Sequence, residues 1–183
     1  MKRKNTHRII LAVILIALGV AFRTIWHLGD NVEFVTTASL LAGSYLGFGF
    51  SIAVPFFVMF ISDLIIGNTN IFIFTWSAYL LIGYFGYLSH LKDLKGRSKV
   101  LEAGKLGIIA SLWFYFWTNF GVWFLDSRGM YPKTFIGLLE SYWYGLPFLK
   151  FTLLGNLLFV PVSFFIVEKL KNLNIGLFKN FAV

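Results

Sequence analysis

A run of 32 residues from Val35 to Ile66 constrains this chain more than any other feature, because Asp63 is the only charged residue in it. As one straight helix, at 1.5 Å per residue, the run would be about 48 Å long. The hydrocarbon core of a membrane is only roughly 30 Å thick. We therefore expect two membrane-spanning helices joined by a glycine-containing turn, over about residues 35–48 and 50–66.

Similar apolar runs make up most of the remaining chain. Hydrophobic residues form 58% of the 183 residues and charged residues only 13%, against roughly 25% charged residues in soluble domains. We expect an all-α membrane protein that forms a single domain over residues 1–183. Its six transmembrane helices are predicted over about residues 9–28, 35–48, 50–66, 71–91, 106–125 and 146–167.

The distribution of basic residues predicts the orientation of these spans. With six spans, 12 of the 16 lysines and arginines fall in the N-terminal segment, the loop after the fourth span and the segment after the sixth. Cytoplasmic segments carry an excess of Lys and Arg, so both ends of the chain are expected in the cytoplasm. A single span over residues 35–66 would place the basic loop at residues 92–99 outside, against this rule.

The N-terminal segment has a second interpretation. Basic residues precede the apolar run from Ile9 to Phe22, and Gly19-Val20-Ala21 would be a passable cleavage site for a signal peptide. We expect instead that this segment stays in place as the first transmembrane helix.

A further apolar and aromatic segment, Thr134 to Leu146, is too short to cross a membrane. We expect it to form a short interfacial or re-entrant helix that caps the outer face of the bundle.

Polar residues at membrane depth are concentrated at the outer ends of the predicted spans, whereas the inner halves hold almost no ionisable residue. Each such group is costly in a bilayer unless it is paired or faces water. One interpretation is a polar, aromatic-lined cavity that opens outward and binds a small solute. The candidate substrate-binding residues are Arg23, His27, Asn31, Asp63, Asn119, Trp123, Tyr131, Glu140 and Asn156.

Two other interpretations of these residues stay open. In the first, the chain is a non-transport scaffold or assembly protein whose polar groups pair internally, for example Arg23 with Asp63, beside an interfacial belt of Trp and Tyr. In the second, the chain is a membrane enzyme that acts on lipid, with Asp63, Glu140 or His27 as acid or base.

Several classes of chemistry lack the residues they need. The chain has no cysteine, and its three histidines are scattered without metal-ligand spacing. It also has no phosphate-binding loop and no dinucleotide fingerprint, so we expect no catalytic residue, no metal and no cofactor. The net charge of +8 is attributed to topology signals and contacts with anionic membrane lipids, and no nucleic acid partner is expected.

Small residues recur at helical spacing in three of the spans, which allows helices to approach closely in a membrane. We expect most of them to pack inside the bundle, and we expect Ala17 and Ala21 to form a docking face for another protein. The residues assigned to internal packing are Ala38, Ala42, Gly43, Gly47, Ala103, Gly107 and Ser111.

Four elements of the sequence carry a resemblance to known proteins: Asn31, Ser62-Asp63-Leu64-Ile65-Ile66-Gly67, Thr118-Asn119-Phe120-Gly121-Val122-Trp123 and Met130-Tyr131-Pro132-Lys133-Thr134. With them the chain resembles an uncharacterised family of prokaryotic six-helix membrane proteins. That family in turn resembles the substrate-binding S components of energy-coupling-factor (ECF) vitamin transporters.

The resemblance to S components implies a six-helix bundle in the cell (inner) membrane of a prokaryote. Such a bundle binds a micronutrient near the outer surface and docks onto a transmembrane coupling protein with two ATPases. An Ala-x-x-x-Ala pattern in the first helix of S components contacts that coupling protein, and Ala17 with Ala21 matches it. The loop at residues 29–34 is shorter than the substrate-closing loop of many S components, so residues 134–146 are the alternative lid.

Overall fold

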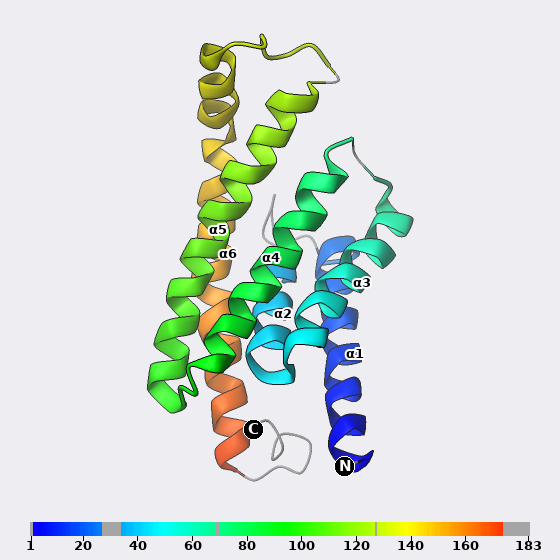
Figure 1. Cartoon of the computed structure of the whole chain (residues 1–183), viewed down its shortest axis with the longest axis vertical. Helices are drawn as coiled ribbons and strands as arrows, with labels where there is room; N and C mark the ends of the chain where they lie inside the picture. Colours follow the sequence, from blue (N-terminus) through cyan, green and yellow to red (C-terminus); the bar gives the residue numbers. More distant parts are fainter. Residues whose placement is uncertain (1, 27–33, 69, 127, 174–183) are drawn as a thin grey trace.

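The computed structural model describes residues 2–26, 34–68, 70–126 and 128–173, and within these residues all regular structure is helical (Figure 1). The elements are α1 (Lys2–Thr24), α2 (Val35–Leu41), the π-helical segment η1 (Ala42–Leu46), α3 (Phe48–Ile66), α4 (Phe72–Leu91), α5 (Gly96–Leu125) and α6 (Phe135–Asn172).

Five of these helices, α1, α3, α4, α5 and α6, are long and apolar enough to cross a membrane. Large apolar side chains such as Val13, Ile73 and Leu158 are exposed on their outer surfaces. A soluble monomer rarely exposes so much contiguous apolar surface, whereas lipid covers it at no cost. The length of these helices and their exposed apolar surfaces therefore indicate a multi-pass membrane protein.

The helices run between two ends of the bundle. The start of α1, the loop from Leu91 to Gly96 and the end of α6 lie together at the lower end in Figure 1, which we call the basic end. The α3–α4 and α5–α6 loops lie toward the opposite end, which we call the far end.

The second predicted span differs in the structure from a transmembrane helix. The apolar helix ends at Leu46, so α2 and η1 together extend over only about 18 Å at 1.5 Å per residue. The chain then turns at Gly47, whose φ of +96° suits glycine because it has no Cβ. Within the residues that the structure describes, five helices rather than six therefore have spanning length.

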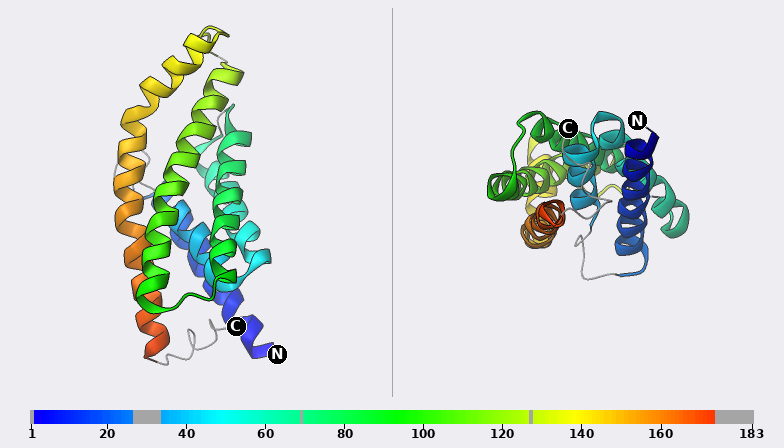
Figure 2. Two further views of the ribbon diagram at one scale, coloured as in Figure 1. Left: turned by 60° about the vertical axis from the view of Figure 1, so that its left-hand side comes forward. Right: turned by 90° about the horizontal axis from the view of Figure 1, so that it is seen from below.

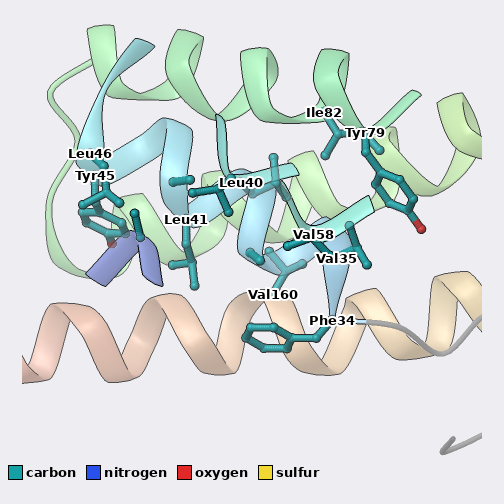
Figure 3. Packing of buried hydrophobic residues seen from close by; sticks show 14 of the residues in the cluster. Phe34, Val35, Leu40, Leu41, Tyr45, Leu46, Val58, Tyr79, Ile82 and Val160 are labelled. Carbon is teal, nitrogen blue, oxygen red and sulfur yellow. The ribbon is translucent and has the colours of Figure 1, made fainter. Parts of the chain in front are cut away.

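Every residue of α2 and η1 is buried, and α2 contacts α1, α3, α4, α5 and α6. Figure 3 shows Leu40 and Leu41 of this segment among the buried side chains of the core, with Val160 of α6 beside them. The segment is apolar because it forms the centre of the protein and not because it faces lipid.

Glycines allow α2, η1 and α3 to pack against α4 with their backbones in contact. A Cβ atom on Gly43 would lie 2.2 Å from the carbonyl oxygen of Gly83. A Cβ on Gly83 would lie 1.9 Å from the oxygen of Ser51, and one on Gly86 would lie 2.6 Å from the oxygen of Leu40. Glycine serves here in the close-packing role that small residues have in membrane bundles. The other small residues assigned to packing, Ala38, Ala42, Ala103, Gly107 and Ser111, are also buried.

The α5–α6 pair extends past the other helices at the far end (Figures 1 and 2). α5 has 30 residues and α6 has 38, which correspond to about 45 and 57 Å of helix. Both lengths exceed the thickness of the hydrocarbon core.

The segment at residues 134–146, expected as a separate interfacial helix or lid, is instead the N-terminal third of α6. The helix begins after Thr134, whose side-chain oxygen accepts a hydrogen bond from the Gly137 amide at 3.2 Å. Pro147 lies inside the helix, and α6 curves in its upper half in the left view of Figure 2. A proline removes one backbone hydrogen bond and bends a helix, but here it does not end the helix.

Candidate functional site

A buried polar cluster joins α1, α3 and α4. The Asp63 carboxylate accepts a hydrogen bond from Arg23 Nη1 on one oxygen and from Trp76 Nε1, at 2.7 Å, on the other. Arg23 Nη1 also lies 2.5 Å from the Ser62 hydroxyl oxygen. Both oxygens of Asp63 are thus used within the bundle, and Arg23 with Asp63 is the internal pair that the scaffold interpretation predicts.

Asn119 and Asn156 lie at the contact between α5 and α6. Asn156 Nδ2 donates to the Ser111 hydroxyl oxygen at 2.9 Å, and Asn119 Nδ2 donates to the Tyr115 carbonyl at 2.8 Å. A Cβ atom on Gly145 would lie 2.4 Å from Asn119 Oδ1, so α6 passes directly over this amide. Asn156 therefore joins the two long helices by a hydrogen bond, whereas the side-chain hydrogen bond of Asn119 stays within α5 and its amide only packs against α6.

Trp123 and Tyr131 lie near the tip of the α5–α6 pair. Trp123 Nε1 donates to the Pro132 carbonyl at 3.0 Å, and the Lys133 ammonium lies 5.7 Å from the centre of the Trp123 ring. Tyr131 lies against Tyr144, with ring centres 6.5 Å apart. Partial burial raises the pKa of the Tyr131 hydroxyl above its ordinary value, and neighbouring acidic groups act in the same direction.

The candidate residues therefore fall into separate groups of contacts. Arg23 and Asp63 form one group, Asn119 and Asn156 lie along the α5–α6 contact, and Trp123 and Tyr131 are held at its tip. Glu140 lines a shallow surface pocket on α6 together with Tyr142 and Trp143. His27 and Asn31 lie outside the described residues.

An open pocket of about 420 Å³ lies at the far end, where the α3–α4 and α5–α6 loops approach each other. We call it the far-end pocket. It is lined by Asn68, Asn70, Ile71, Val122, Asp126, Arg128 and Met130. Two side-chain amides and two opposite charges thus meet in one concave site large enough for a small polar molecule.

Asp126 shapes the wall of this pocket. It ends α5 with a left-handed backbone conformation, at φ +34°, and its Oδ1 accepts the Met130 amide at 2.8 Å. Asn68 and Asn70 were not among the binding residues expected from the sequence. They could have been found from the sequence, because both lie in the polar turn after the third predicted span, at the outer side where the other candidate substrate-binding residues were expected.

A second buried polar cluster, at the basic end, was not foreseen from the sequence. Glu168 of α6 accepts hydrogen bonds from the Tyr45 hydroxyl at 2.9 Å, from the Gly96 amide at 2.6 Å and from Lys171 Nζ at 3.0 Å. Its carboxylate therefore sits at the N-terminus of α5, where the helix dipole favours negative charge. Glu168 ties η1, α5 and α6 together.

Lys99 lies beside this cluster and is also buried. Its ammonium donates to the Ser89 carbonyl at 2.8 Å and lies 5.7 Å from the centre of the Tyr45 ring. Lys99 belongs to the basic loop at residues 92–99 that was interpreted as a topology signal, because the sequence shows that this residue is charged but not that it is buried.

Fold and site together define the class: a multi-pass, all-helical membrane bundle with polar clusters at both ends and an open polar pocket at one of them. Among the described residues, no group of three or more His, Cys, Asp or Glu side chains is placed to hold a metal ion. The chain belongs to the family described as "Family of unknown function (DUF6580)", which matches residues 3–175. No match is found among curated proteins or among solved structures.

Proposed function

We propose that the protein is a membrane-embedded solute-binding subunit for the uptake of a small micronutrient, similar to the S component of an ECF transporter. In this proposal the bundle lies in the cell (inner) membrane of a prokaryote with both ends of the chain in the cytoplasm. The observation that carries the proposal is the far-end pocket, which opens at the end of the bundle opposite the basic loops.

The lining of the far-end pocket suits a polar solute that carries charge or many hydrogen-bonding groups. Arg128 can donate up to five hydrogen bonds to an anionic group, and the Asn68 and Asn70 amides offer both donors and acceptors. Asp126 supplies negative charge on the same wall. A volume of about 420 Å³ lies within the usual range for small-molecule sites.

Energy for uptake would come from a partner, namely a transmembrane coupling protein with two ATPases. Ala17 is exposed on α1 and Ala21 is half-buried, so this face is available for close helix packing with such a partner. The proposal assigns no catalytic step and no cofactor to the chain.

Native mass spectrometry of the protein isolated from its own membrane tests the proposal. We expect a retained small molecule in the wild type and at least about tenfold lower retention in Arg128→Gln, because a hydrogen bond to a charged group contributes about 1.5–3 kcal/mol. Arg97→Gln is the matched control, since it removes the same charge from an exposed position at the basic end. Absence of any small molecule in the wild type, or equal retention in the two variants, would contradict the proposal.

A non-transport scaffold or assembly protein is the second candidate, favoured by the internal pairing of Arg23 with Asp63 and Trp76. In that case the purified protein retains no solute, and Arg128→Gln changes nothing that the experiment measures.

A further inference from the structure

An apolar groove of about 180 Å³ lies between α1 and α6. Within the described residues the backbones of these two helices stay apart and both pack against α2. Their side chains meet nearer the far end, where the Phe22 and Phe159 rings lie edge to face with their centres 5.4 Å apart. In the view from below in Figure 2, α1 and α6 stand apart with α2 between them. Leu41 and Tyr45 form part of the floor of the groove.

The walls of the groove are two helical faces. On α1 they include Leu11, Leu15 and Leu18, and on α6 they include Ser163, Val167 and Leu170. These residues are three or four positions apart, so each set forms one stripe along its helix. The stripe on α1 is about 10 Å long at 1.5 Å per residue and runs along a membrane-length helix. The groove therefore has the direction and the polarity of a lipid acyl chain.

Cationic side chains border the basic end of the groove. On α6, Lys171 directly follows Leu170, and its ammonium lies 5.3 Å from the centre of the Tyr45 ring. On α1, Arg8 lies three residues before Leu11 and so continues the same helical face. The Nε atom of Arg8 is buried and has no hydrogen-bond partner among the residues that the structure describes.

The balance of charge at this point is positive. Glu168 already accepts a hydrogen bond from Lys171, which offsets the charge of that lysine. No carboxylate in the part of the chain that the structure describes forms an ion pair with Arg8, and an anionic group at the mouth of the groove would complement its charge. Apolar walls that end at such a cation match a lipid with a negative head group.

We propose that the groove between α1 and α6 binds one anionic phospholipid, with an acyl chain between Leu11 and Val167 and its phosphate at Arg8 and Lys171. This site is independent of the far-end pocket and lies at the other end of the bundle. It is a fixed lipid site, as distinct from the general contacts that any basic loop makes with a membrane surface.

The role of the cationic residues is tested by native mass spectrometry of the full-length protein in detergent. The protein is offered equal amounts of dioleoylphosphatidylglycerol, which is anionic, and dioleoylphosphatidylcholine, which has no net charge. The wild type is expected to retain the anionic lipid preferentially. Arg8→Gln is expected to lower this preference about fivefold, the weight of one basic residue near an anionic surface. Lys169→Gln is the matched control, because Lys169 lies at the same end but packs over the Phe165 ring outside the groove.

The binding of an acyl chain between α1 and α6 is tested by filling the groove with a larger side chain. Ser163→Phe places a ring in the groove and should lower the retention of both lipids, whereas Val162→Phe, at a position 46% exposed on the outside of α6, should not. Arg8→Lys keeps the charge and should keep the preference for the anionic lipid. Equal retention of the two lipids by the wild type overturns the proposal. So does unchanged retention in Ser163→Phe, which would leave only a site for a free anion.

Discussion

Replacing Asp63 with alanine should destabilise the bundle, because it removes the acceptors that hold Arg23 and Trp76. The side chains of Arg23 and Asp63 are only 15% and 6% exposed, so water cannot replace most of the lost attraction. Removing one partner of a buried ion pair costs about 3–5 kcal/mol. Ser62 Oγ remains 2.5 Å from Arg23 Nη1, and we therefore expect the lower end of this range, about 3 kcal/mol.

The assay is the free energy of unfolding in detergent, from a denaturant titration followed by circular dichroism. The double variant Arg23→Met/Asp63→Leu should recover most of the loss, because a buried pair replaced by apolar side chains leaves no unpaired charge. Glu102→Ala is the control, since its partner Lys92 is 55% exposed and such pairs contribute less than about 1 kcal/mol.

Two results would refute this reasoning about Asp63. One is an unfolding free energy of Asp63→Ala within about 1 kcal/mol of the wild type, the size of a surface pair. The other is a double variant that is no more stable than Asp63→Ala. Either result would mean that Asp63 does not serve chiefly as a structural partner of Arg23, and would return it to the set of candidate ligand-binding residues.

Two further predictions concern packing and orientation. Gly83→Ala should lower the unfolding free energy by about 2 kcal/mol or more, because its Cβ would lie 1.9 Å from the Ser51 oxygen. Gly104→Ala is the control and should be neutral or stabilising, because no atom lies within 4 Å of the added Cβ. Equal effects of the two substitutions in denaturant titrations would contradict the close packing of α3 against α4. Because the chain has no cysteine, a membrane-impermeant maleimide applied to intact cells should label Arg128→Cys and not Lys95→Cys, and the reverse pattern would disprove the cytoplasmic placement of both ends.

The helical class of the protein could be predicted because a long apolar segment in a membrane must satisfy its own backbone hydrogen bonds, which a helix does. The pairing of Arg23 with Asp63 was also foreseeable as part of one of three interpretations. Both residues were expected at the outer ends of their helices, and an isolated charge at that depth needs a partner. Whether Asp63 pairs with Arg23 or binds a ligand could be distinguished only once the packing of α1 against α3 was known.

The extents of two helices could not be predicted from the sequence. Hydropathy reports that the segment from Val35 to Leu46 avoids water, but it does not distinguish lipid from protein interior, and this segment is entirely inside the protein. Likewise, Pro147 is compatible with either the end of a helix or a bend within one, and tertiary packing against α5 decides for the bend.

The polar cluster at the basic end depends on contacts between residues far apart in the chain. Tyr45 and Glu168 are 123 positions apart, and neither local spacing nor charge pattern indicates that they meet. Lys99 lies within a basic segment that suggests exposure to solvent, yet it is buried against Ser89. Such sites become visible only once the helices are packed.

The short, enclosed helix formed by α2 and η1 has a consequence for how the protein is assembled. At about 18 Å it cannot insert as a stable spanning segment, because its ends would leave backbone groups unsatisfied in lipid. The five long helices can each enter the bilayer independently, and only afterwards is there an enclosure for the short one to occupy. Biogenesis should therefore pass through a stage in which residues 35–46 are the last to settle, and damage to their surroundings would expose them to quality-control proteases first.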